Sequence, residues 1–119
     1  MNNLLIVQLA GVAFVAYMAF ASMWLQYLAI MNLKEHRSKL TVAAKIWAYP
    51  MLLVGLLSDA MFNMVIGTVA YVELPHEVLF TSRCIRHLDE TGWRGLVARW
   101  FCRNFMDPFD PDGKHCNVK

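Results

Sequence analysis

The sequence predicts an all-α membrane protein, in which a two-helix transmembrane hairpin precedes a short C-terminal amphipathic helical tail. Two long apolar stretches, residues 4–33 and 46–72, predict the hairpin, because about 20 helical residues are enough to cross the hydrocarbon core of a bilayer. The composition agrees, since 58% of the 119 residues are hydrophobic and the mean hydropathy is +0.40. We therefore divide the chain into a transmembrane hairpin, residues 1–72, and a tail of helices and loops at the membrane surface, residues 73–119.

The first stretch, residues 4–33, is expected to be retained as a span. Ala19-Phe20-Ala21 offers a small-x-small site at which a signal peptide could be cleaved. A signal peptide, however, has basic residues before a short apolar core, whereas no cationic side chain precedes Leu4 and the apolar run continues to Leu33. A retained span is therefore favoured over a cleaved signal.

The loop between the two stretches, residues 34–45, is basic. Its cationic side chains are Lys34, Arg37, Lys39 and Lys45. Ser38 or Thr41 is suited to cap the second helix, and Trp47 and Tyr49 lie where an aromatic belt is expected. The positive-inside rule predicts that this loop faces the cytoplasm and that both termini lie on the other side. The tail is basic as well, but most of its charges lie farther from a span.

The tail is predicted to contain two short helices. Pro75 suits the first turn of a helix that would run to about Leu88, and residues 89–92 form a break. A second helix, residues 93–105, shows amphipathic spacing. The remainder is rich in Pro, Gly and Asp and is predicted to be a loop.

The length and charge of the chain argue against two classes of function. The 47 residues of the tail are too few to build a sizeable soluble core, and the chain contains no paired base and nucleophile of an enzyme site. A net charge of +2 is too weak to indicate nucleic-acid binding. We expect no enzymatic activity, no cofactor and no nucleic-acid partner.

Each apolar stretch contains a stripe of small and polar residues. The first stripe consists of Gln8, Gly11, Ser22 and Gln26, and the second of Gly55, Asp59, Asn63 and Gly67. Each stripe falls on one face of a helix. Small residues let helices approach, and polar groups hydrogen-bond across the contact. We expect the two stripes to pair, so that they hold the hairpin or a homo-oligomer together.

Asp59 lies near the middle of the second stretch, where a carboxylate is costly in lipid. The favoured interpretation is structural, with Asp59 and Asn63 joining helices. The alternative makes Asp59 a proton or ion site in a water-accessible path.

The predicted helix over residues 93–105 combines aromatic and basic side chains. They are Trp93, Arg94, Arg99, Trp100, Phe101, Arg103 and Phe105. Aromatic side chains favour the bilayer interface and arginines reach toward lipid phosphates. We therefore expect this helix to lie in the headgroup plane. The alternative is that it packs against the preceding helix.

The tail also contains the residue types of a metal site or a disulfide. The weak metal candidates are Cys84, His87, Cys102, His115 and Cys116. No Cys-x-x-Cys pair is present, so we expect no metal. A disulfide between Cys102 and Cys116 is a second alternative, if the tail faces an oxidising compartment. Free thiols are favoured over both.

Several short motifs in the second stretch and the tail resemble those of a known group. They are Gly67-Thr68, Glu73-Leu74-Pro75, Leu79-Phe80-Thr81, Gly92-Trp93-Arg94, and Asp107-Pro108-Phe109-Asp110-Pro111 with His115-Cys116. In these motifs the chain is similar to uncharacterised small membrane proteins encoded by bacteriophages and prophages. The resemblance implies a bacterial inner membrane and a phage setting. It carries no catalytic residues and does not imply lysis.

Together these features predict a non-enzymatic, phage- or prophage-encoded protein of the inner membrane. Its expected partners are the lipid bilayer and either a second copy of itself or other membrane proteins. The alternative is a pore-forming or holin-like permeability protein that uses Asp59. A membrane-potential measurement separates the two, because a pore depolarises the membrane and an adaptor need not.

Overall fold

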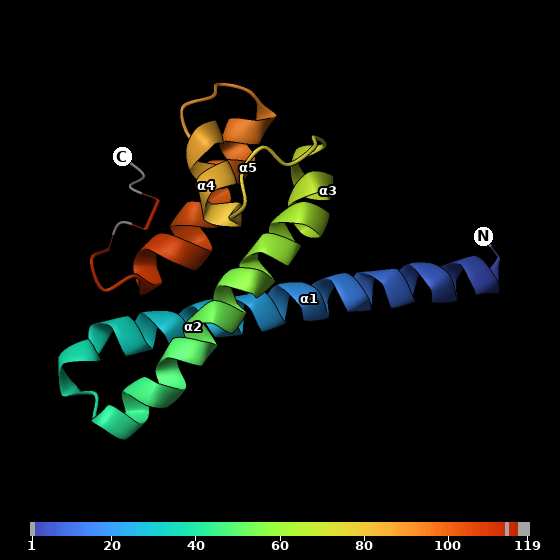
Figure 1. The fold of residues 1–119 in the computed structure, drawn as a ribbon. Helices are drawn as coiled ribbons and strands as arrows, with labels where there is room; N and C mark the ends of the chain where they lie inside the picture. The colour runs from blue at the N-terminus through green and yellow to red at the C-terminus, as the bar shows by residue number, and fades with distance from the viewer. Residues whose placement is uncertain (1, 114, 117–119) are drawn as a thin grey trace.

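The structure is a computed structural model that describes residues 2–113 and 115–116. These residues form helices, turns and irregular segments, and no strand is found among them. The predicted all-α class is therefore confirmed. Two long helices come first in the chain, and the short helices of the tail follow them (Figure 1).

Helix α1, Asn3–Glu35, contains the first apolar stretch. Asn2 caps it, because its side-chain oxygen accepts a hydrogen bond from the backbone N–H of Leu4 at 3.3 Å. The helix ends where the basic residues begin. A single 3-10 turn, Arg37–Lys39, then connects it to the second long helix.

Helix α2, Val42–Phe62, begins at Thr41, whose hydroxyl accepts a hydrogen bond from the backbone N–H of Ala44 at 3.2 Å. Thr41 was one of the two predicted caps. The helix continues through a π-helical turn, Asn63–Gly67, into α3, Thr68–Tyr71. Both α1 and this continuous rod of α2 and α3 are long and apolar enough, by length and composition, to cross a membrane.

The two long helices cross instead of lying side by side (Figure 1). Gly55 of α2 meets Ile30 of α1, and a Cβ at Gly55 would collide with that side chain. The loop joins the helices on one side of the crossing, and on the other side they diverge. The N-terminal half of α1 extends away from the rest of the chain, and residues 2–19 are all exposed.

A segment of turns and bends, residues 72–79, separates α3 from α4, Phe80–His87. The predicted helix start at Pro75 was therefore wrong. The physical reason is a tertiary contact, because the side-chain amide of Asn63 donates hydrogen bonds to two consecutive carbonyls of this segment. These backbone groups thus find a partner without forming a helix.

Helix α5, Trp93–Phe101, begins where the second tail helix was predicted. It continues in a π-helical turn, Cys102–Met106, and a 3-10 turn, Asp107–Phe109. The predicted helical segment, residues 93–105, therefore corresponds to α5 and the turn after it.

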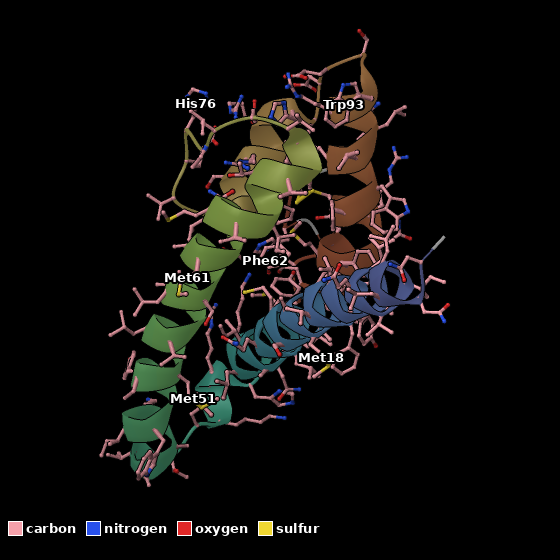
Figure 2. All side chains as sticks on the ribbon, turned by 90° about the vertical axis from the view of Figure 1, so that its right-hand side faces the viewer. Met18, Met51, Met61, Phe62, His76 and Trp93 are labelled. Carbon is pink, nitrogen blue, oxygen red and sulfur yellow. A yellow bond between two sulfur atoms is a disulfide. The ribbon has the colours of Figure 1, made fainter. Side chains whose placement is uncertain are left out.

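The buried core lies where α1, the far half of α2 and the tail meet. It consists of Phe62, Tyr71, Phe80, Cys84, Ala98, Cys102, Met106 and Cys116. Phe20 and Tyr27 of α1 pack against it. Figure 2 shows Phe62 on the side of α2 that faces α1 and the tail, whereas His76 and Trp93 lie at the outer end of the tail. The tail is therefore packed against both long helices.

Candidate functional site

The second stripe faces the tail over most of its length. A carboxylate oxygen of Asp59 accepts a hydrogen bond from the backbone N–H of Phe80 at 3.3 Å. Asn63 is completely buried and donates to carbonyls of the segment 72–79. Gly55 is the member of this stripe that meets α1. The expected pairing of the two stripes therefore differs from the contacts in the structure, where the tail covers most of the second stripe.

The first stripe lines an open groove between the diverging helices, which we call the wedge groove. Its volume is about 1070 Å³. The lining residues are Gln8, Gly11, Val12, Val15, Ala16, Ala19, Ser22, Met23 and Gln26 of α1, and Ser58, Met61, Phe62, Val65 and Ile66 of the opposite rod. The Oε1 atom of Gln26 is buried without a hydrogen-bond partner among the described residues. A Cβ at Gly11 would meet nothing within 4 Å, so the groove has free space beside this residue.

Aromatic side chains fasten the tail to α1. The indole N–H of Trp24 donates to the carbonyl of Phe105 at 3.0 Å, and the hydroxyl of Tyr27 donates to that of Met106 at 2.7 Å. The rings of Phe20 and Phe105 meet edge to face with 5.0 Å between their centroids. Part of the predicted membrane interface is thus packed inside the protein.

Two of the predicted interface arginines bind backbone carbonyls of the chain. Arg94 donates through Nε to the carbonyl of Tyr71 at 2.9 Å, and Arg99 donates through Nη1 to that of Leu88 at 2.7 Å. Such contacts satisfy carbonyls that are left open at the end of a helix. These two side chains therefore serve tertiary packing in the structure.

The remaining members of the predicted interface fall into two groups. Phe101 packs edge to face within the aromatic core, as Phe105 does. Trp93 and Trp100 are 49% and 55% exposed, and Arg103 is exposed as well. The structure therefore leaves the two tryptophans and Arg103 on the surface of the chain.

A network of charged side chains beyond α3 was not predicted. Glu73 accepts hydrogen bonds from Nε2 of His87 at 2.7 Å and from Arg86, and Nδ1 of His87 lies 2.7 Å from a carboxylate oxygen of Glu90. The buried His87 ring stacks on Tyr71. Burial alone would raise the pKa of Glu73, but hydrogen bonds from His87 and Arg86 lower that pKa below its usual range. No periodic pattern links these residues, so the sequence held no signal for the network.

Two of the cysteines form a disulfide. Cys102 is bonded to Cys116, so the expectation of free thiols was wrong for this pair. Cys84 is free and buried, with its sulfur 3.1 Å from the hydroxyl of Tyr71, and burial raises the pKa of its thiol to about 12. Among the described residues no three His, Cys, Asp or Glu side chains are grouped to hold a metal ion.

The end of the tail is bound to the loop end of α1. The ammonium group of Lys34 lies 3.0 Å from carboxylate oxygens of both Asp110 and Asp112, and Nδ1 of His115 lies 2.9 Å from Asp110. Burial opposes ionisation of Asp110, but hydrogen bonds from the Asp112 backbone, Lys34 and His115 lower its pKa to about 2. The described end of the tail therefore lies beside the loop, which differs from the expectation that the C-terminus and the loop are on opposite faces.

One buried charge has no hydrogen-bond partner in the described part of the chain. Arg83 is fully buried, and none of its guanidinium nitrogens is bonded to a described residue. A Cβ at Gly67 would lie 2.8 Å from Nη1 of Arg83 and 3.0 Å from Oδ1 of Asn63. The absence of a side chain at Gly67 therefore makes room for both polar groups between α2 and α4.

No family model, curated protein or solved structure matches this chain. The resemblance to phage-encoded membrane proteins therefore remains a prediction from the tail motifs. The features that the structure itself provides are two long apolar helices, the wedge groove between them and a tail packed against both.

Proposed function

We propose that this chain is a multi-pass protein of the bacterial inner membrane, encoded by a phage or prophage. Its two long helices form a membrane hairpin, and it acts without catalysis, by associating with a second copy or with another membrane protein. The observation that carries this proposal is the wedge groove, an open and mostly apolar space between the long helices that α1 also lines with the polar side chains of Gln8 and Ser22.

The exposed half of α1 supports the membrane location. Its large apolar side chains include Leu4, Val12 and Val15, which are 62%, 68% and 67% exposed. In water they would belong to an extended apolar surface of a kind that soluble monomers rarely leave uncovered. Lipid tails are as apolar as these side chains, so a bilayer covers this surface without a partner protein.

The wedge groove supports association. Lipid chains match its apolar lining, but they cannot hydrogen-bond to the exposed side chains of Gln8 and Ser22. A helix of another protein can supply such partners, and Gly11 leaves room for its close approach. We therefore assign the wedge groove to a helix of a second copy or of another membrane protein.

Site-specific photo-crosslinking in bacterial membranes tests the proposal. A photoreactive residue at Val12 lies in the wedge groove, whereas one at Val7, which is equally exposed at 67%, lies on α1 outside the groove. We expect Val12 to give a discrete protein adduct, identified by mass spectrometry, and Val7 to give mainly lipid adducts. Lipid adducts alone at Val12, or the same protein adduct from both sites, would contradict association through the groove.

A cytoplasmic position is proposed for the loop, residues 34–45. Four cations, Lys34, Arg37, Lys39 and Lys45, lie in this loop, and the contact of Lys34 with Asp110 supports a common face for the loop and the described end of the tail. The positive-inside rule assigns such a face to the cytoplasm. The Cys102–Cys116 disulfide favours an oxidising compartment instead. We give more weight to the charges, because they direct the insertion that precedes disulfide formation.

A further inference from the structure

A second groove lies at the loop end of the two long helices, and we call it the loop-end groove. Its volume is about 490 Å³. Ile30 and Leu33 of α1 and Leu52 of α2 supply apolar lining, while Arg37 and Lys45 add cationic side chains. No acidic residue lines this groove among those that the structure describes. The groove thus combines apolar surface with positive charge.

Two of its cations are available to a ligand. Lys34 also lines the groove, but it is paired with Asp110 and Asp112. Arg37 and Lys45 are exposed, and neither has a hydrogen-bond or ion-pair partner among the described residues. The groove therefore presents two uncompensated positive charges.

The surroundings of the loop-end groove are those of a bilayer interface. Tyr49 lines the groove and is 68% exposed, and Trp47, two residues earlier on α2, is 76% exposed. Exposed aromatic side chains beside basic residues are typical of the headgroup level of a membrane. A ligand with a charged head and an apolar chain fits both the lining and this depth.

We propose that the loop-end groove binds an anionic phospholipid of the bilayer. Its phosphate lies between Arg37 and Lys45, and the start of an acyl chain lies along Ile30, Leu33 and Leu52. Basic pockets between membrane helices bind anionic headgroups on the cytoplasmic side, and the guanidinium of Arg37 can contact two phosphate oxygens at once. A zwitterionic lipid should bind less well, because the cation of its headgroup is repelled by Arg37 and Lys45. This inference rests on the proposed membrane function.

Lipid binding to the purified full chain, counted by native mass spectrometry, tests the site. Phosphatidylglycerol is compared with phosphatidylcholine of the same acyl chains. We expect the wild type to prefer phosphatidylglycerol. Arg37→Gln and Lys45→Gln should each weaken its binding about fivefold, the scale of one basic side chain at an anionic surface. Binding of phosphatidylcholine should not change.

Lys39→Gln is the matched control, because Lys39 is an exposed cation of the same loop that does not line the groove. We expect it to change phosphatidylglycerol binding less than twofold. An equal loss in Lys39→Gln, or equal binding of the two lipids by the wild type, overturns the site. Displacement of the lipid by soluble glycerol phosphate also overturns it, because the ligand would then need no acyl chain.

Flotation with phosphatidylcholine vesicles distinguishes failure of the site from failure of the membrane function. A wild-type protein that does not float overturns the proposed membrane function and the lipid site together. A protein that floats but shows no preference for phosphatidylglycerol overturns the lipid site alone. The membrane function and the lipid site are both supported if the wild type floats and prefers phosphatidylglycerol. This preference should then be lost in Arg37→Gln and Lys45→Gln but kept in Lys39→Gln.

Discussion

At the scale of single residues, the carboxylate of Asp59 accepts a hydrogen bond from the backbone N–H of Phe80, so it joins α2 to α4. An unpartnered carboxylate is costly in lipid, and this bond gives Asp59 a partner within the chain. Asn63, one helical turn later, is bonded to the same part of the tail. The polar side of α2 is therefore covered by the tail, which favours a structural role for Asp59 over a proton path.

Two substitutions of Asp59 separate the structural role from a role in permeability. Asn keeps an oxygen that can accept the bond from Phe80, whereas Leu removes it. We expect Asp59→Asn to preserve packing, and Asp59→Leu to lower stability in detergent by about 1 to 2 kcal/mol, the scale of hydrogen bonds between membrane helices. Thermal unfolding and a proteoliposome flux assay measure the two effects. Wild-type proton or cation conductance that Asp59→Asn abolishes would establish the pore instead.

Asp110 predicts how stability depends on pH. Its pKa is lowered from 3.8 to about 2 in the folded chain, so the stability that its ionised form contributes is complete above about pH 4 and is lost as the pH falls through about 2. We expect Asp110→Asn to cost about 2 kcal/mol at neutral pH. The difference in melting temperature from the wild type should shrink toward pH 2. A difference that stays constant over this range would contradict the bonds from Lys34 and His115.

At the scale of elements, the two long apolar stretches of the sequence correctly located α1 and α2. Thr41 was also one of the two residues predicted to cap α2. Amphipathic spacing located α5 and the turn after it. The start of α4 was misplaced at Pro75, because a side chain of α2 binds the backbone of the segment that precedes α4. Sequence patterns for helices and turns depend on neighbouring residues in the chain. They therefore cannot predict a hydrogen bond from Asn63 to backbone carbonyls 14 and 15 residues later.

The candidate site shows the same division between local pattern and tertiary contact. Periodicity groups the polar residues of each long helix on one face, but it could not tell which neighbour that face meets. The second stripe meets the tail, and the first stripe borders the open wedge groove. Likewise, the bond between Cys102 and Cys116 depends on how the tail folds back, which the spacing of the cysteines left open.

The start of α5 depends on a close contact at Gly95. A Cβ at this position would overlap the backbone carbonyl of Glu90, which has no flexible end to move. We expect Gly95→Ala to lower the free energy of unfolding by about 1 to 3 kcal/mol, as overpacking does. Gly11→Ala is the control, because its Cβ meets nothing within 4 Å. Melting temperatures compare them, and equal values for both variants would contradict the contact.

At the scale of the whole molecule, the tail returns along the two long helices. It begins beyond Tyr71 at the far end of the α2–α3 rod, and Asp110 and Asp112 reach Lys34 at the loop end of α1 (Figure 1). The loop and the described end of the tail should therefore share one face of the membrane. The positive-inside rule favours the cytoplasm for that face, and the proposed hairpin has the N-terminus on the other face.

Labelling of single cysteines in intact cells tests this arrangement most directly. Asn2→Cys, Ser38→Cys and Pro111→Cys are each introduced into a chain without native cysteines and exposed to a membrane-impermeant thiol reagent. All three positions are exposed on the protein itself, so a difference in labelling reports the side of the membrane. We predict that Asn2→Cys is labelled, whereas Ser38→Cys and Pro111→Cys are both protected until the cells are permeabilised. Protection of Ser38→Cys with ready labelling of Pro111→Cys would contradict the shared face.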